Sequence, residues 1–158
     1  SDKFKVHDIH RVYTAIVYNQ FATDEGTINK PIARHKTDRK KMAIDPNGRH
    51  AVTHYRVIER LKQNFSLVEC ELETGRTHQI RVHMASINHP LLGDEVYGPK
   101  QKPFATQGQV LHAGVLGFDH PITGEYMEWH ADLPDYFQGI LKGFDKRTFL
   151  TLIGYKKG

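Results

Sequence analysis

The chain contains 158 residues, of which 39% are hydrophobic and 25% are charged, and its formal net charge is +4. This length suits one domain with its own hydrophobic core, so we expect residues 1–158 to fold as a single unit. No run of about eighteen apolar residues is present, which argues against a membrane partner. Cys70 is the only cysteine and has no disulfide partner in the chain, which favours a reducing compartment and a cytoplasmic location.

The first predicted element is a strand over residues 11–18, "RVYTAIVY". Apolar side chains occur on both of its faces, with Ile16 on one and Tyr13 on the other, so the strand should be buried on most of its surface. A shorter strand is predicted in "EGTINKPI", where Gly26 marks a turn and Pro31 ends the run.

A basic loop follows, "ARHKTDRKKM" at residues 33–42, with five basic residues and one acidic residue. Its net charge equals the +4 of the whole chain, so the remaining residues are neutral in sum. A focused cationic loop suits an anionic polymer such as RNA, because each phosphate that it contacts releases counterions. A loop that only exposes its charges to solvent is the alternative that this pattern leaves open.

Two strands are predicted next, in "HAVTHYRVIERL" and "FSLVECELE", and the short polar "KQN" between them indicates an antiparallel hairpin. Val68, Cys70 and Leu72 share one face of the second strand. Further strands in "QVLHAGVLGF" and "GEYMEWHA" are joined by a turn that contains Pro121 and Gly124, and "LPDYFQGILKGF" is a final amphipathic helix. These elements predict the α+β class, with an antiparallel-dominated mixed sheet and a few packed helices.

Another helix is predicted between the two strand pairs, beginning at Thr77, which can cap it, and ending near Asn88. Ile80, Met84 and Ile87 lie on one buried stripe of this helix, and Arg81 falls about 100° from Ile80 around the axis. A long side chain at that position can pass over apolar neighbours and present its guanidinium in a crevice next to the core.

The eleven histidines raise the possibility of a metal site, but no metal-binding motif accompanies them. His78 and His83 are about 140° apart around a helix, and neither HExxH nor paired CxxC spacing is present. No GxSxG, GxxxxGK[ST] or GxGxxG segment occurs, and Cys70 has the alternating apolar surroundings of a structural thiol. These missing motifs argue against a zinc site, a serine or cysteine nucleophile and a nucleotide-phosphate loop.

The combination that remains is an arginine, a tyrosine and a basic loop. An enzyme that acts on a base in folded nucleic acid extracts the base, stacks it on an aromatic ring and holds the neighbouring phosphates. Tyr13, Arg81 and the loop around Arg39 are candidates for these parts. The residue types alone also fit a core aromatic at Tyr13 and a structural ion pair at Arg81.

The segment "TGRTHQIRVHMASINHPLLGDEVYG", with "RVYTAIVYNQF", "TDRKKM", "LVECELETG" and "LHAGVLGFDHPITGE", closely resembles the RNA pseudouridine synthases that modify large-subunit ribosomal RNA. The resemblance extends from about residue 11 to residue 137. It implies the pseudouridine synthase fold, RNA as the partner and an isomerisation without cofactor or metal. In that reaction uracil is detached from C1′ of the ribose, rotated and reattached through C5. We expect a monomer.

The resemblance also assigns roles to individual residues. It implies that Tyr13 packs on the flipped uracil, that Ile80 lines the pocket, and that Arg81 pairs with the essential aspartate of an HRLD-type motif. The residues that would contact RNA, in the basic loop and at the helix entrance, are Arg34, Arg39, Lys40, Lys41, Arg76, His78 and Gln79. For the last three, hydrogen bonding to the surrounding loop is an equally open alternative.

The HRLD-type motif has no counterpart in this chain, and no aspartate here has its context. In the family this motif lies upstream of the strand at residues 11–18. We therefore expect the chain to be a C-terminal portion of a pseudouridine synthase catalytic domain, with the N-terminal part missing, and to be inactive alone. A noncatalytic RNA-binding or RNA-chaperone protein with the synthase fold is the alternative.

Overall fold

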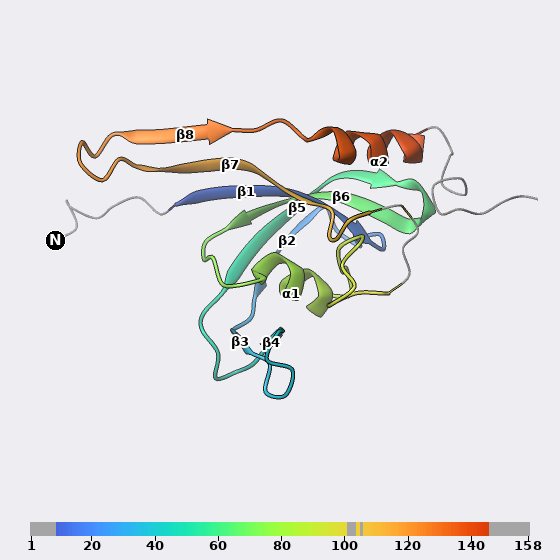
Figure 1. Ribbon diagram of the computed structural model, residues 1–158, viewed down its shortest axis with the longest axis horizontal. Coiled ribbons are helices and arrows are strands. Elements are labelled where there is room, and N and C mark those ends of the chain that lie inside the picture. The colour runs from blue at the N-terminus through green and yellow to red at the C-terminus, as the bar shows by residue number, and fades with distance from the viewer. Residues whose placement is uncertain (1–8, 101–103, 105, 146–158) are drawn as a thin grey trace, which may run out of the picture.

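The computed structural model describes residues 9–100, 104 and 106–145, which are organised around a six-stranded sheet of order β2-β5-β6-β1-β7-β8 (Figure 1). The strands of this sheet are β1 (His10–Tyr18), β2 (Glu25–Asn29), β5 (Val52–Leu61), β6 (Phe65–Leu72), β7 (Leu111–Asp119) and β8 (Tyr126–His130). The other elements are the small hairpin of β3 (Ile32–Arg34) and β4 (Met42–Ile44), a helical turn at Lys62–Asn64, and the helices α1 (Gln79–Ser86) and α2 (Asp135–Asp145).

Every strand pairing in the described part of the chain is antiparallel. The predicted α+β class and both predicted hairpins are confirmed, whereas the parallel component of the expected mixed sheet does not occur among these residues. In the "KQN" turn between β5 and β6, Gln63 and Asn64 take left-handed φ angles of 61° and 64°. The turn sets the register that places Leu61 opposite Phe65.

The two faces of the sheet carry separate apolar clusters, because side chains alternate along each strand. Ala15 of β1 packs in the cluster on the α1 side, whereas its neighbour Ile16 belongs to the cluster that includes α2. The predicted common face of Val68, Cys70 and Leu72 is confirmed, since all three lie in the α1 cluster. Burial raises the pKa of the Cys70 thiol to about 12, which fits a structural role.

Helix α1 lies against one face of the sheet (Figure 1) and begins later than predicted. Thr77 does not cap it: His78 occupies the N-cap position with φ 57° and makes no side-chain cap hydrogen bond. The side chain of Gln79 closes the entrance instead. Its Oε1 accepts hydrogen bonds from Thr74 Oγ1 at 2.8 Å and from the backbone N–H of Arg76 at 2.9 Å.

The buried stripe of α1 is confirmed for Ile80 and Met84, which are both buried in the α1 cluster, and Ile87, directly after the helix, is partly buried against the same cluster. A buried histidine fastens the same helix to its neighbours. Nδ1 of His83 accepts a hydrogen bond from Thr53 Oγ1 at 2.8 Å, and its Nε2 donates to the carbonyl oxygen of Lys30 at 2.9 Å. Burial lowers the pKa of His83, so the ring is neutral and has one donor and one acceptor nitrogen, as these contacts require.

The last three elements match the predicted segments. β7 and β8 form a hairpin at one edge of the sheet, and α2 follows β8 (Figure 1). Phe137, Ile140 and Phe144 of α2 are buried in the second apolar cluster. Of the helices described here, none has the length and apolar character that a bilayer crossing requires.

Candidate active site

A cavity of about 270 Å³ opens where the N-terminal end of α1 meets β1 and the adjoining ends of β6 and β7. Its described walls are formed by Arg11, Tyr13, Leu72, Gly75, Arg76, His78, Gln79, Ile80, Arg81 and Leu111. The three residues predicted to serve catalysis, Tyr13, Ile80 and Arg81, therefore border one cavity although β1 and α1 are far apart in the sequence.

The cavity walls are positively charged. Arg11, Arg76 and Arg81 contribute guanidinium groups, and none of the described wall residues is acidic. Tyr13 supplies an aromatic ring in the same wall. Guanidinium groups bind phosphates and carboxylates, and an aromatic ring can carry a planar base, so the cavity suits a nucleotide.

Arg81 is fixed by an ion pair whose acidic partner, Asp94, was not foreseen from the sequence. Its Nε donates to Asp94 Oδ2 at 2.8 Å, and its Nη2 donates to Asp94 Oδ1 at 3.1 Å. The side chain of Arg81 is 12% exposed and that of Asp94 is 0% exposed. The hydrogen bond with Asp94 raises the pKa of Arg81. The expectation that the acidic partner of Arg81 lies outside this chain is thus incomplete, and Nη1, which has no hydrogen bond among the described residues, is available for a second acceptor.

Asp94 is held in turn by its own loop. Its Oδ1 also accepts the backbone N–H groups of Val96 at 3.0 Å and Tyr97 at 3.1 Å. Four donors therefore surround one buried carboxylate, which makes the burial of its charge tolerable. The sequence signal was an aspartate directly after a glycine in "LLGDEVYG", which indicates a turn but not the contact with Arg81.

Tyr97 connects this ion pair to the basic loop. Its ring centroid lies 5.0 Å from Cζ of Arg81 and 5.9 Å from Nζ of Lys41. Its Oη accepts the backbone N–H of Met42 at 2.8 Å and donates to Nδ1 of His78 at 2.7 Å. Burial, assisted by the nearby charge of Arg81, lowers the pKa of His78, in keeping with a neutral ring that accepts this hydrogen bond.

The predicted RNA-contacting cations of the basic loop lie outside the cavity, on the β3–β4 hairpin beside α1 (Figure 1). Arg34, Arg39 and Lys40 are exposed, and Lys41 is half-buried. Two of the guanidinium groups also hold the turn together: Arg34 Nη1 donates to the carbonyl of Arg39, and Arg39 Nη1 donates to that of His35, each at 3.2 Å. The hairpin therefore presents its positive charge on an ordered turn.

The side-chain amide of Gln79 is held by hydrogen bonds within the protein. Its side chain is buried, and Nε2 donates to the carbonyl of Val52 and to Thr53 Oγ1, both at 3.0 Å. With Oε1 also bonded, Gln79 follows the alternative that the sequence left open, hydrogen bonding to the surrounding loop, which gives it a positioning role at the helix entrance. Arg76 remains in the cavity wall while its Nε donates to the carbonyl of His50 at 2.8 Å.

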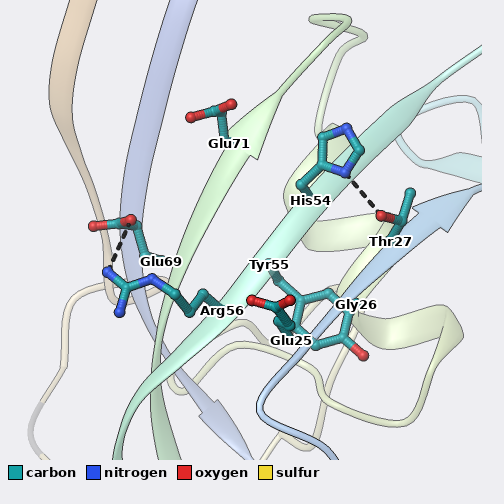
Figure 2. A pocket seen from close by; sticks show the side chains of 8 residues that line it. All are labelled: Glu25, Gly26, Thr27, His54, Tyr55, Arg56, Glu69 and Glu71. Atoms are coloured by element: carbon teal, nitrogen blue, oxygen red, sulfur yellow. Dashed lines mark hydrogen bonds and ion pairs between the residues drawn. The ribbon is translucent and has the colours of Figure 1, made fainter.

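A larger hollow of about 430 Å³ lies on the opposite face of the sheet, over β2, β5 and β6 (Figure 2). Its walls include Glu25, Glu69 and Glu71, whose carboxylates repel phosphates. Arg56, its only arginine among the described walls, donates to Glu69 at 3.3 Å, as the dashed line in Figure 2 shows. The smaller, cationic cavity is therefore the better candidate for a nucleotide. Over the described ranges, no three histidine, cysteine or acidic side chains are grouped as metal ligands.

Several known proteins are similar to this chain in sequence and in fold. Over 138 residues the chain is 54% identical to the uncharacterized RNA pseudouridine synthase YlyB of Bacillus subtilis (strain 168), a match that covers 87% of this chain and 45% of that protein. Over 149 residues it is 49% identical to the ribosomal large subunit pseudouridine synthase D of Zymomonas mobilis, covering 89% of this chain and 46% of that protein. The chain thus spans about half the length of the curated relatives that it matches.

Among solved structures, human RNA pseudouridylate synthase domain containing 1 matches with a TM-score of 0.71 at 28% identity, covering 85% of this chain and 58% of that one. The family described as RNA pseudouridylate synthase matches residues 1–86, which is more than half of the chain. On this match, together with the fold and the residues that border the cavity, the chain belongs to the RNA pseudouridine synthase family.

Proposed function

We propose that this chain forms the uridine-binding part of an RNA pseudouridine synthase, an isomerase that converts uridine to pseudouridine within RNA. The observation that carries the proposal is that Tyr13, Ile80 and Arg81 border one cationic cavity. An aromatic ring, an apolar side chain and a fixed guanidinium are the groups that a site for one flipped base requires. Membership of the family supports the same chemistry.

Arg81 would orient a carboxylate beside the target nucleotide. The isomerisation breaks the bond between C1′ and N1 of uracil and forms one between C1′ and C5, while the proton lost from C5 is balanced by one gained at N1. A guanidinium favours the ionised carboxylate and fixes its oxygens. Asp94 engages Nε and Nη2 of Arg81, so Nη1 would donate the hydrogen bond to the aspartate of the HRLD-type motif. This sequence does not contain that motif.

Large-subunit ribosomal RNA is the substrate that we propose, because the Zymomonas mobilis relative is named a ribosomal large subunit pseudouridine synthase. The cationic β3–β4 hairpin supports an RNA partner more generally. We place the protein in the cytoplasm, as a monomer that requires neither a metal nor a cofactor.

The proposal is tested by incubating a large-subunit ribosomal RNA transcript with the full-length protein and, separately, with residues 1–158, and by mapping pseudouridine in the product. We expect pseudouridine at a discrete position with the full-length protein and none with the shorter chain, whose sequence has no HRLD-type motif. Tight RNA binding by the full-length protein without any pseudouridine would instead indicate a noncatalytic RNA-binding protein or chaperone.

Replacing both Lys40 and Lys41 with alanine should flatten the dependence of RNA affinity on salt. Each phosphate contact to single-stranded RNA contributes about 0.7 to the slope of log affinity against log salt concentration, so losing two contacts should lower the slope by about 1.4. Fluorescence anisotropy titrations between about 50 and 200 mM salt measure this slope.

The matched control removes the same charge elsewhere. Lys62 at the β5–β6 turn and Lys142 on α2 are both exposed and lie outside the hairpin, so their replacement with alanine should change the slope much less. Equal changes in the two double variants would show that RNA responds only to the net charge, and the hairpin would lose its assigned role.

A further inference from the structure

Arg11 borders the cavity, but the proposed function assigns it no role. Its Nε is buried and has no hydrogen-bond partner among the described residues. The other two cavity arginines are engaged, Arg81 with Asp94 and Arg76 with the carbonyl of His50. The two Nη groups of Arg11 likewise make no hydrogen bond among the described residues but are not buried, so they are the donors of this cavity-wall guanidinium that a ligand can reach.

The strand geometry places Arg11 and Tyr13 together. They are two residues apart on β1, so both side chains leave the same face of the sheet, and both border the cavity. Two residues along a strand are separated by about 7 Å, which is the scale of one nucleotide in an extended RNA strand. A base on Tyr13 would therefore bring a flanking phosphate within reach of Arg11.

Gly75 provides the room that the Arg11 guanidinium occupies. A Cβ atom at Gly75 would overlap Nη1 of Arg11, so the guanidinium lies against the loop between β6 and α1 only because this position has no side chain. The colliding atom is the far end of a flexible side chain, so a methyl group at Gly75 would displace the guanidinium rather than the backbone.

We propose that Arg11 binds a backbone phosphate that flanks the uridine whose base rests on Tyr13. This inference rests on the proposed function and extends it by naming the residue that recognises the target nucleotide as part of a phosphodiester chain. The planar guanidinium fork matches two phosphate oxygens, and the cavity has no described acidic residue that would compete for it. Arg81, engaged by Asp94, remains assigned to the reacting carboxylate.

The test is a double-mutant cycle on RNA binding by the full-length protein. The probes are a short single-stranded RNA with one uridine and two versions in which the phosphate on the 5′ or the 3′ side of that uridine is a neutral methylphosphonate. Arg11→Gln and the methylphosphonate at the contacted position should each weaken binding about 10- to 100-fold. Combined, they should weaken it no further than either change alone, because both remove the same contact.

Gly75→Ala is the second variant, because it keeps every charge and displaces only the guanidinium. It should weaken binding of the native RNA and abolish most of the methylphosphonate effect. Arg39→Gln, outside the cavity, is the matched control, and its effect should add to that of either methylphosphonate. Thermal melts of each variant identify any that fails to fold.

Independent, additive effects of Arg11→Gln and of both methylphosphonates would overturn the proposal, as would a Gly75→Ala variant that responds to them like the unchanged protein. These outcomes are distinct from failure of the proposed function. Non-additive effects at Arg11 without any pseudouridine formation would support the phosphate contact and overturn the proposed isomerase function. Pseudouridine formation together with additive effects would support the isomerase function and overturn the phosphate contact.

Discussion

Asp94→Ala should lower the free energy of unfolding by about 3–5 kcal/mol. The substitution leaves the guanidinium of Arg81, whose side chain is 12% exposed, without the carboxylate that it contacts through Nε and Nη2. It also removes the acceptor of the backbone N–H groups of Val96 and Tyr97. A desolvated cation with no partner destabilises the fold by more than the intact ion pair stabilises it. Urea denaturation of the unchanged and the substituted protein measures the difference.

An exposed ion pair in the same chain is the matched control. Asp24 contacts Arg60 at 2.9 Å, but its side chain is 86% exposed. Solvent screens that pair, so Asp24→Ala should cost less than about 1 kcal/mol. If Asp94→Ala costs no more than Asp24→Ala, the pair of Arg81 with Asp94 does not hold the helix entrance in place.

Arg81→Lys in the full-length protein should reduce the rate of pseudouridine formation by about 100- to 1,000-fold while changing RNA affinity by less than about threefold. Lysine keeps the positive charge, but its ammonium cannot contact Asp94 through two nitrogens and still present a third to another carboxylate. Single-turnover kinetics with saturating enzyme measure the rate, and anisotropy titrations measure the affinity.

Lys40→Ala is the contrasting variant, because the β3–β4 hairpin lies outside the cavity. It should raise KM more than it lowers kcat, the opposite of the pattern expected for Arg81→Lys. A loss of RNA affinity in Arg81→Lys as large as its loss of rate would make Arg81 a contact to the RNA backbone and would leave the reacting carboxylate without an orienting group.

The strands could be predicted because the pattern that specifies them is local. Alternation at residues 11–18 and the "KQN" turn depend only on neighbours in sequence, and β1 and the β5–β6 hairpin follow from them. The start of α1 was misplaced because it depends on a loop. The side chain of Gln79 reaches back to Thr74 and Arg76, and that contact outweighs the capping preference of Thr77.

The candidate site could also be predicted only in part. Resemblance to the family brought Tyr13, Ile80 and Arg81 together before any fold was known, whereas Asp94 was missed because the Gly- and Pro-rich loop gives no sign of its turn back to Arg81, 13 residues earlier. Arg11 could have been found from the sequence, because it precedes Tyr13 by two residues and alternation places both on one face.

The ring of Tyr97 lies close to Lys41 of the hairpin and to Arg81 of the cavity. One aromatic ring therefore separates a cation of the hairpin from a cation of the cavity wall, so under the proposed function an RNA chain bound at the hairpin would meet the next positive charge at the cavity. The electrostatic energy of a negatively charged chain would fall as it moves from the hairpin toward the cavity, which would favour docking after a loose first encounter.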